Sequence, residues 1–273
     1  MNNPTVSICM ITYNHAKYIE KAIEGVLFQK TNFNIELIIS NDNSTDDTDI
    51  VIKKIIKEKD NHKIIKYFNQ EKNLGMMKNF IFALNVCKGE YIALCEGDDY
   101  WTDENKLQKQ IDFMKSNNEI SFTFHRAEIL FKENFTLNYR HKSYINKEIV
   151  EPQNFLVKLG ARFCTPSVVF KKEVINPLPE WYVDCHVGDF PLMFLALEKG
   201  KIGYLEDIMC VYRLSSDGSW SQSNLKLKNR YLNIYKMINL NKFINKNTQG
   251  KYKKYLKTNL ISYLISKTIA SFK

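Results

Sequence analysis

The chain has 273 residues, of which 44% are hydrophobic and 25% charged, a composition typical of a globular protein with one large domain, alone or with an appendage. Residues 218–273 hold 12 Lys and Arg and no Asp or Glu, whereas the rest of the chain holds 27 basic and 30 acidic residues. The net charge of +9 therefore comes from the tail, and a uniformly basic nucleic-acid-binding domain does not fit. The sequence does not open with a basic segment followed by an apolar one, and it contains no run of 18 apolar residues. It therefore predicts a cytoplasmic protein with no signal peptide and no membrane-spanning helix.

Strands and helices alternate four times in the first hundred residues. Apolar runs predict strands at 6–12, 35–39, 64–68 and 91–95, and residues with a period of 3.6 predict a helix after each of the first three. Asn14 is placed to cap the first helix, and Ser44 followed by Asp47 has the pattern of a second helix start. This alternation predicts an α/β fold with a mainly parallel sheet and helices on both faces.

Polar residues follow each of these strands, at 12–14, 42–44, 73–75 and 96–99. Ligands of open α/β sheets bind at this edge, where the carboxyl ends of the strands meet. Glu96, Asp98 and Asp99 crowd three carboxylates into one loop, which is unfavourable unless a cation or a hydrogen-bonding ligand offsets the repulsion. Hard divalent cations take oxygen ligands and share them with phosphates, so the loop predicts a metal–diphosphate site. An ordinary acidic turn is the alternative.

Two other nucleotide-binding folds share the alternation but need glycine-rich loops. The first strand is followed by Thr-Tyr-Asn-His and not by G-x-G-x-x-G, and no G-x-x-x-x-G-K-[ST] occurs in the chain. Six scattered cysteines lack a C-x-x-C pair and resemble small buried hydrophobic residues in a reducing compartment. A Rossmann dehydrogenase, a P-loop NTPase and a zinc or disulfide framework are therefore not expected.

Four motifs in series resemble the nucleotide-sugar half of bacterial family 2 glycosyltransferases of the GT-A fold: ITYN at 11–14, NDNSTD at 41–46, NLG at 73–75 with KN at 78–79, and EGDD at 96–99. GDFPL at 188–192, EKGKI at 198–202 and VYR at 211–213 are similar to the acceptor side of the same family. The resemblance covers residues 4–221. It implies a GT-A domain over 1–221, with a donor half at 1–100 and an acceptor half at 101–221, and a basic helical region at 222–273.

The resemblance implies a role for each donor-side motif. Asp42 would read the uracil edge, Asp98 would hold Mn²⁺ or Mg²⁺ on the diphosphate, and Glu96 would approach the ribose, although the family usually has Asp there. Gly97 would allow a close backbone approach to the ligand. The other expected donor-binding residues are Thr12, Tyr13, Asn14, Asn73, Gly75 and Lys78. As alternatives, Asp42 is a turn or cap residue and Lys78 a solvated helix lysine.

On the acceptor side, the resemblance implies that Asp189 is the base that activates the acceptor hydroxyl in an inverting transfer; an N-cap role is the alternative. Thr165 lies in a stretch, 164–170, that we expect to be a strand lining the acceptor pocket. Trp181 and Tyr182 are candidate sugar-stacking rings, although aromatic residues are more often core. Ser215 stands where many relatives have a His that helps to hold the metal or phosphate.

The tail predicts a basic amphipathic helix. Its apolar face consists of Leu256, Leu260, Tyr263 and Leu264, with Ile261, Ile265 and Ile269 alongside. Such a helix suits peripheral contact with an anionic membrane and hence a lipid-linked saccharide acceptor. Packing back onto the domain or contact within a homo-oligomer explains the pattern equally well.

The favoured function is an inverting, metal-dependent transferase that moves a sugar from a nucleotide-sugar donor, expected to be UDP-linked, to a saccharide in surface-glycan synthesis. A non-catalytic sugar-nucleotide-binding or membrane scaffold protein is the alternative. A sugar nucleotidyltransferase fits less well because it needs a glycine-rich basic loop after the first strand, where this chain has Tyr13 and Asn14.

Overall fold

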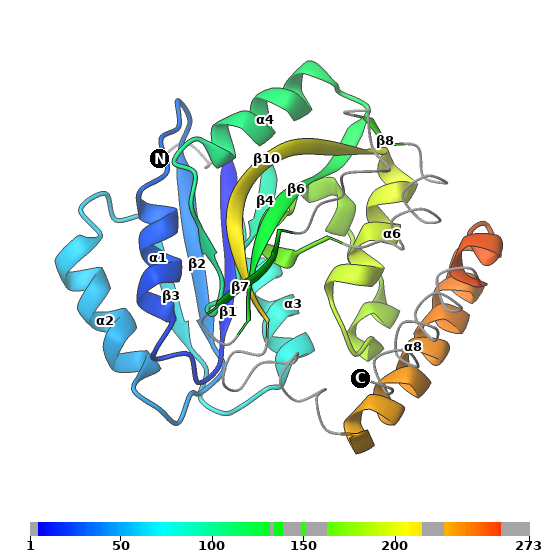
Figure 1. The fold of residues 1–273 in the computed structure, drawn as a ribbon, viewed down its shortest axis with the longest axis horizontal. Coiled ribbons are helices and arrows are strands. Elements are labelled where there is room, and N and C mark those ends of the chain that lie inside the picture. Colours follow the sequence, from blue (N-terminus) through cyan, green and yellow to red (C-terminus); the bar gives the residue numbers. More distant parts are fainter. Residues whose placement is uncertain (1–4, 132–133, 139–148, 151–162, 215–226, 258–273) are drawn as a thin grey trace.

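A computed structural model describes residues 5–131, 134–138, 149–150, 163–214 and 227–257. Within these residues, ten strands form one sheet in the order β3-β2-β1-β4-β9-β6-β10-β5, with β7 beside β6 and β8 beside β10. Helices cover both faces of this sheet (Figure 1). The predicted α/β arrangement is confirmed.

The N-terminal half is the parallel part of the sheet. β1 (Val6–Thr12) pairs in parallel with β2 (Ile35–Asn41) and β4 (Tyr91–Leu94), and β2 pairs in parallel with β3 (Ile65–Asn69). The connecting helices are α1 (Ile19–Leu27), α2 (Thr48–Lys59) and α3 (Met76–Val86). β1, β2 and β4 are buried almost throughout and mostly apolar, as the sequence predicted, whereas β3 at the edge of the sheet is only partly buried.

The second half adds antiparallel strands to the same sheet. β9 (Val169–Lys171) joins β4 to β6 (Ile120–Phe131) and is antiparallel to both, whereas β10 (Lys201–Leu214) is parallel to β6. β5 (Tyr100–Trp101), β7 (Asn134–Asn138) and β8 (Ile149–Val150) are antiparallel to their neighbours. The stretch 164–170, expected to be one strand, is instead a 3₁₀ turn η1 (Thr165–Ser167) followed by β9.

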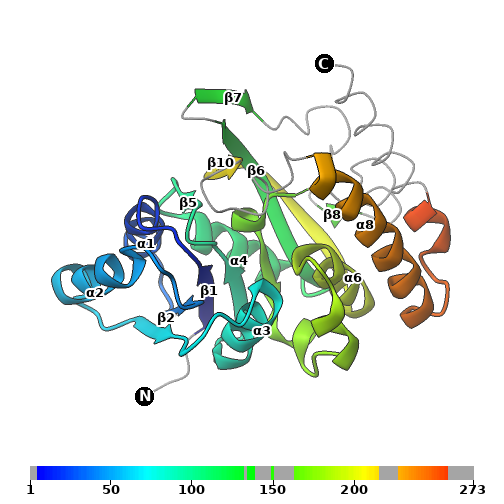
Figure 2. The same cartoon turned by 90° about the horizontal axis from the view of Figure 1, so that it is seen from below.

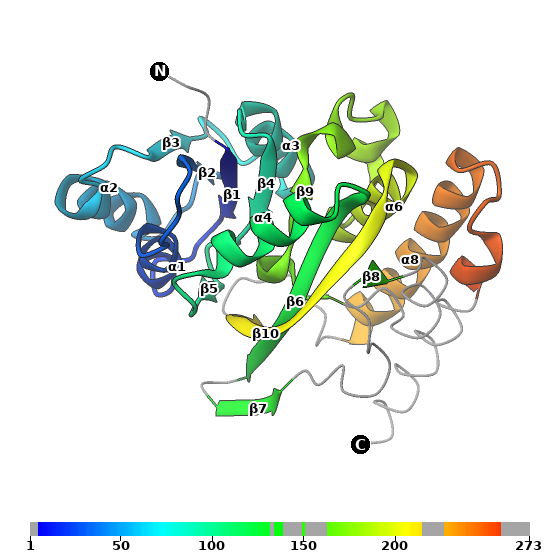
Figure 3. The same ribbon diagram turned by 90° about the horizontal axis from the view of Figure 1, so that it is seen from above.

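Two apolar cores lie on opposite faces of the sheet. One joins α1, α2 and α4 (Lys106–Ser116) to alternate residues of β1 such as Ile8 and Met10. The other joins α3, α6 (Asp189–Lys199) and α8 (Leu227–Asn247) to the intervening residues such as Cys9. Figure 3 shows α4 crossing the strands on the first of these faces. All six cysteines are free, as expected, and Cys164 alone is only partly buried.

The described part of the basic tail packs against the domain. Leu240, Ile244, Tyr252 and Leu256 are buried in the same core as α6, and the Tyr252 ring lies 5.2 Å from that of Phe194. Figure 2 shows α8 running beside α6. Leu256, expected on the apolar face of an amphipathic helix, is a core residue, which agrees with the alternative that this face packs back onto the domain. The rest of that face, at 260–269, lies outside the described residues. In the described part of the chain, no helix is both long and apolar enough to cross a bilayer.

Both expected helix caps are wrong. α1 begins at Ile19, four residues after the turn that contains Asn14, and α2 begins at Thr48 with no side-chain cap from Asp47. Asn14 adopts a positive φ of 57° and Ser44 bonds to Asn41, so both residues build the loops before the helices. The Asn14 side chain bonds to Thr45 and the Ser44 side chain to Asn41, and the local spacing used to predict caps does not indicate these partners.

A buried carboxylate holds the far edge of the parallel strands together. Glu36 is 3% exposed and accepts hydrogen bonds from Ser7 Oγ at 2.5 Å, from the Lys88 N–H at 2.7 Å and from the Lys66 ammonium. Burial raises the pKa of Glu36, but the bonds from Lys66, Ser7 and Lys88 outweigh burial, so the pKa lies below its ordinary value.

We expect Glu36→Gln to lower the free energy of unfolding at pH 7 by about 1–3 kcal/mol, because an amide replaces a charged acceptor of three donors. Since the folded-state pKa is depressed, the carboxylate stabilises the fold above its unfolded pKa of about 4.3, and this contribution is lost as pH falls through the folded pKa. Urea unfolding at pH 7 and near pH 3 measures both effects. Glu58→Gln, at an exposed site, is the control, and a deficit of equal size at both pH values would contradict the assignment.

Candidate active site

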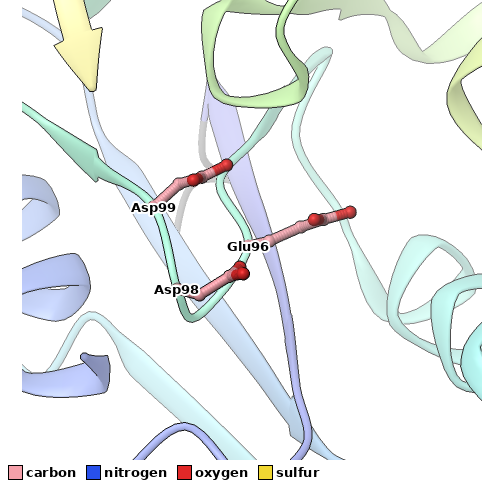
Figure 4. Close-up of side chains that lie close together, drawn as sticks. All are labelled: Glu96, Asp98 and Asp99. Carbon is pink, nitrogen blue, oxygen red and sulfur yellow. The ribbon is translucent and has the colours of Figure 1, made fainter. Parts of the chain in front are cut away.

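The three carboxylates predicted from the sequence lie together in the loop between β4 and β5. Figure 4 shows Glu96, Asp98 and Asp99 projecting from this one loop. One ligand atom of each lies within 4.8 Å of those of the other two. Asp98 is 5% exposed and Asp99 is fully buried, while Glu96 is partly exposed. The loop is anchored by the Gly97 N–H, which donates to the Ile11 carbonyl at 3.0 Å, and by the Asp99 N–H, which donates to the Glu96 carbonyl at 3.1 Å.

Burial and neighbouring negative charge raise the pKa of Glu96 and of Asp99. Burial raises the pKa of Glu96, and the charges of Asp98 and Asp189 add to the increase. Burial likewise raises the pKa of Asp99, followed by the charges of Asp98 and Glu96, while Arg213 acts in the opposite direction. Asp189 follows Asp99 by ninety residues in the sequence, and its charge contributes to the raised pKa of Glu96. That Asp189 acts as the base at this site stays a prediction, which rests on the family resemblance.

The donor set fits a hard divalent cation. All three groups are carboxylates, and Asp99 Oδ2 is buried with no hydrogen-bond partner in the described part of the chain. Asp99 Oδ1 is already engaged by the Arg213 N–H at 2.7 Å. A buried, unpartnered carboxylate oxygen beside two further carboxylates is the arrangement that Mg²⁺ or Mn²⁺ would stabilise.

Gly97 is required by packing within the protein. A Cβ there would lie 2.5 Å from Thr12 Oγ1 and 2.9 Å from Ile19 Cδ1, so the acidic loop sits directly against the end of β1 and the start of α1. The structure therefore gives Gly97 a reason that differs from the ligand approach expected above. Thr12 in turn is buried, and its hydroxyl lies 3.2 Å from His15 Nδ1.

The two loops after β1 and β2 are bonded to each other. The Asn14 N–H donates to Ser44 Oγ at 2.9 Å, and Asn14 Oδ1 accepts from the Thr45 N–H at 2.8 Å. The His15 N–H donates to Thr48 Oγ1 at 2.9 Å. Tyr13 between them is 38% exposed. Of the expected donor residues in these loops, Tyr13 is thus partly open to solvent, whereas Asn14 joins the two loops.

Asp42 fixes the loop that precedes α3. Its Oδ1 accepts from the Leu74 N–H at 2.6 Å and its Oδ2 from the Gly75 N–H at 3.0 Å, while the Asn73 amide donates to the Asp42 carbonyl at 3.1 Å. Gly75 has φ of 83°, which favours glycine. Each carboxylate oxygen retains a second lone pair, so reading of a base by Asp42 stays a prediction. Lys78 is exposed on the first turn of α3.

One residue that the sequence argument quoted without assigning a role is central here. Asn79 is buried and bonds twice to Ser40 at the end of β2, accepting from Ser40 Oγ at 2.6 Å and donating to the Ser40 carbonyl at 3.0 Å. In the sequence, only the spacing of Asn79 four residues after Gly75 could have indicated this anchor. It sets where α3 begins.

Asp189 is the first residue of α6 and does not cap it. The cap position is Gly188, and Asp189 Oδ1 accepts from the adjacent Phe190 N–H at 2.7 Å. Burial raises the pKa of Asp189, and the Phe190 bond partly offsets the increase. A Cβ on Gly188 would lie 2.6 Å from the Phe80 ring, so α6 starts in direct contact with α3.

The two aromatic candidates on the acceptor side belong to the support of this helix. Tyr182 is fully buried and its hydroxyl donates to the Gly188 carbonyl at 2.7 Å, so its ring offers no face to a sugar, contrary to the expectation. Trp181 is partly buried and its ring lies 5.5 Å from that of Phe243 in α8. Thr165 is partly exposed at the start of η1. Ser215 lies outside the described residues.

The sequence also matches the family model described as Glycosyl transferase family 2 over residues 7–176, more than half of the chain. The chain belongs to glycosyl transferase family 2. This match covers β1 to β9 and therefore the acidic loop and the loops that contain Asn14 and Asp42.

Two similar proteins differ in how much of their length this chain covers. An uncharacterised protein of Mycobacterium tuberculosis is 30% identical over 230 residues, which are 79% of this chain and 60% of that protein. This chain therefore spans less than two thirds of that relative's length. The Escherichia coli protein WfaP, named a UDP-Glc:alpha-D-GlcNAc-diphosphoundecaprenol beta-1,3-glucosyltransferase, is 30% identical over 86% of this chain and 87% of its own.

Solved structures confirm the predicted GT-A fold. The mannosyltransferase PcManGT of Pyrobaculum calidifontis, in complex with GDP-Man and Mn²⁺, superposes with a TM-score of 0.66 over 95% of this chain and 70% of that chain, at 16% sequence identity. At this identity the likeness concerns the fold alone.

The packing around Gly97 leads to a stability prediction for this family 2 chain. We expect Gly97→Ala to lower the free energy of unfolding by about 1–3 kcal/mol, because the added methyl overlaps Thr12. The double variant Gly97→Ala with Thr12→Ala removes the nearest atom, Thr12 Oγ1, and should lose less stability than the two single changes together. Chemical denaturation of the four proteins measures this coupling. Additive losses would show that overlap with the Thr12 hydroxyl is not the cause, since alanine at position 12 keeps the Cβ that lies 2.8 Å from the added methyl.

Proposed function

We propose that this chain transfers a sugar from a nucleotide-sugar donor to a hydroxyl of a saccharide acceptor with inversion at the anomeric carbon. The observation that carries the proposal is a cluster of carboxylates that fits a cation, together with a separate, partly buried carboxylate, Asp189, whose charge acts on Glu96 of that cluster. The membership of family 2 supplies the class of reaction.

Asp189 is the proposed base. Its carboxylate sits at the start of a helix whose position is set on two sides, by the Tyr182 hydroxyl and by Phe80 of α3. Burial raises the pKa of Asp189, which makes its carboxylate a stronger base than one in water. A single base that activates one hydroxyl for in-line attack on the anomeric carbon gives inversion.

Asp98 is the proposed metal ligand, with Asp99 and Glu96 beside it. A divalent cation bound there would neutralise the charge that develops on the leaving diphosphate without a proton donor. The chain's own residues have the task of holding these carboxylates at fixed positions, through the packing of Gly97 and the bonds of the loop to Ile11 and Arg213.

The proposed donor is UDP-linked. WfaP, a close match over most of its length, is named for UDP-Glc, whereas the more distant PcManGT was solved with GDP-Man. The remaining lone pairs of Asp42 could accept from the N–H of a uracil ring, and the loops that contain Thr12, Tyr13, Asn14, Asn73, Gly75 and Lys78 surround the same edge. A lipid-linked saccharide is the proposed acceptor, in line with the diphosphoundecaprenol in the name of WfaP.

Nucleotide release from a panel of UDP- and GDP-sugars, with Mn²⁺ or a chelator, tests this function. We expect Asp189→Asn to lower kcat by about 10²–10⁴-fold while leaving the dissociation constant of the donor unchanged, because the amide keeps the shape and loses the base. Asp98→Ala should instead weaken metal-dependent donor binding.

The exposed Asp184→Asn, in the turn before α6, is the matched control and should behave as the wild type. A wild type that binds donor but shows no acceptor-dependent turnover would favour the non-catalytic binding protein. Full activity of Asp189→Asn would exclude Asp189 as the base.

We further propose that the tail meets an anionic membrane. The outer face of α8 exposes Leu232 and Tyr235, which are 49% and 63% exposed, followed by Lys236, Lys242 and Lys246. No acidic residue occurs from 218 onward. Each Lys near an anionic surface contributes about 1 kcal/mol. In Figure 1, α8 begins at the lower edge, toward which β1 runs, so its first turns lie on the site's side of the molecule.

Flotation with vesicles of neutral or anionic phospholipid measures this contact. We expect Lys236→Glu with Lys242→Glu to reduce binding to anionic vesicles at least about tenfold, since the change reverses two charges on the outer face. Lys54→Glu with Lys57→Glu, which makes the same charge change on α2 at the other end of the molecule, is the control (Figure 1). Equal effects of the two pairs, or binding to neutral vesicles as strong as to anionic ones, would contradict the proposal. A homo-oligomer stays a prediction.

A further inference from the structure

Arg213, near the end of β10, contacts the acidic loop at two points. Its backbone N–H donates to Asp99 Oδ1 at 2.7 Å, and its Nη1 donates to the Asp98 carbonyl at 2.5 Å. These contacts follow from the sheet. β10 is antiparallel to β5 with Val211 opposite Tyr100, and the same register continued by two residues brings Arg213 opposite Asp98. The end of β10 is therefore joined to the loop by both backbone and side chain.

The guanidinium of Arg213 lies between two aromatic rings. It is 4.5 Å from the centre of the Tyr100 ring and 5.0 Å from the centre of the Tyr18 ring. Tyr100 directly follows the acidic loop, and Tyr18 directly precedes α1. A planar cation is attracted to both ring faces, so Arg213 connects the loop to the turn that follows β1.

Arg213 also supplies positive charge where the loop needs it. Asp99 is fully buried beside Asp98 and Glu96, and Asp99 Oδ2 has no hydrogen-bond partner in the described residues. Three carboxylates so close together repel one another and would separate if the loop were free to move. A lysine could supply the charge but not the planar fork that reaches a carbonyl while stacked between rings.

We propose that Arg213 is a positioning residue that holds the acidic loop in the geometry in which Asp98 meets the divalent cation. It acts through the Asp98 carbonyl and the Asp99 side chain and not as a ligand of the cation. This inference rests on the function proposed above. The competing role is a direct contact of the guanidinium with the donor diphosphate, and the two roles differ in what happens to the loop before any ligand binds.

Hydrogen exchange of the ligand-free protein tests the loop itself. The amides of Gly97 and Asp99 donate within the protein, to Ile11 and Glu96, and should exchange slowly in the wild type. We expect Arg213→Lys to speed the exchange of these amides at least about tenfold while leaving the amides of β1 and β2 unchanged. Lys21→Ala is the matched control, because Lys21 Nζ lies 3.9 Å from the centre of the same Tyr100 ring but on the exposed side of α1.

Calorimetry with Mn²⁺ in the presence of UDP tests the consequence. We expect Arg213→Lys to weaken Mn²⁺ binding by about 10–100-fold, as loss of groups that orient a metal ligand does, with a much smaller change in the affinity for UDP measured with chelator. Lys21→Ala should match the wild type in both measurements. Arg213→Ala should show the larger effect of the two substitutions at this position, and Arg213→Lys decides the outcome if the alanine variant does not fold.

Wild-type exchange rates in Arg213→Lys would overturn the inference, as would unchanged Mn²⁺ affinity. A loss of UDP affinity in chelator as large as the loss of Mn²⁺ affinity would also overturn it, in favour of direct contact with the diphosphate. If the wild type binds neither UDP nor Mn²⁺, the proposed function fails, and the exchange measurement still decides whether Arg213 holds the loop.

Discussion

Repulsion among Glu96, Asp98 and Asp99 is the constraint on which the site depends. Their ligand atoms lie within 4.8 Å of one another at the end of a central strand, where burial already disfavours charge. Such a loop keeps its shape only when its neighbours fix it. Gly97 packs against Thr12 on one side, and β10 reaches the loop through Arg213 on the other, so the geometry comes from β1 and β10 as much as from the loop.

Helix α3 relates the two halves of the site. At its start, Asp42 holds the Gly75 N–H and Asn79 holds Ser40, which ties the helix to β2 on the donor side. One residue later, Phe80 packs against Gly188, directly before the proposed base. One helix therefore joins the end of β2 to the turn that precedes Asp189. The close fit leaves little room for a larger side chain at Gly188.

Most of the individual elements could be predicted because their signals are local. Apolar runs ending in polar loops placed all four parallel strands within a residue or two, and the series of motifs indicated the family and the acidic site. Predictions failed where a polar or aromatic side chain had several partners available. Asn14 and Ser44 bond across two loops and do not cap helices, and Tyr182 supports Gly188 from inside the core and does not face a ligand.

The sequence by itself determined the alternating strands and helices, the gathering of polar loops at one sheet edge, and the identity of the carboxylates there, since these follow from the period of apolar residues and from chain order. Only the tertiary structure decided that the charge of Asp189 acts on Glu96, that Arg213 reaches the acidic loop, and that the first part of the basic tail packs on α6. Each of these interactions joins segments far apart in the chain. Local sequence patterns do not specify them, because burial from water determines which distant surfaces pack together.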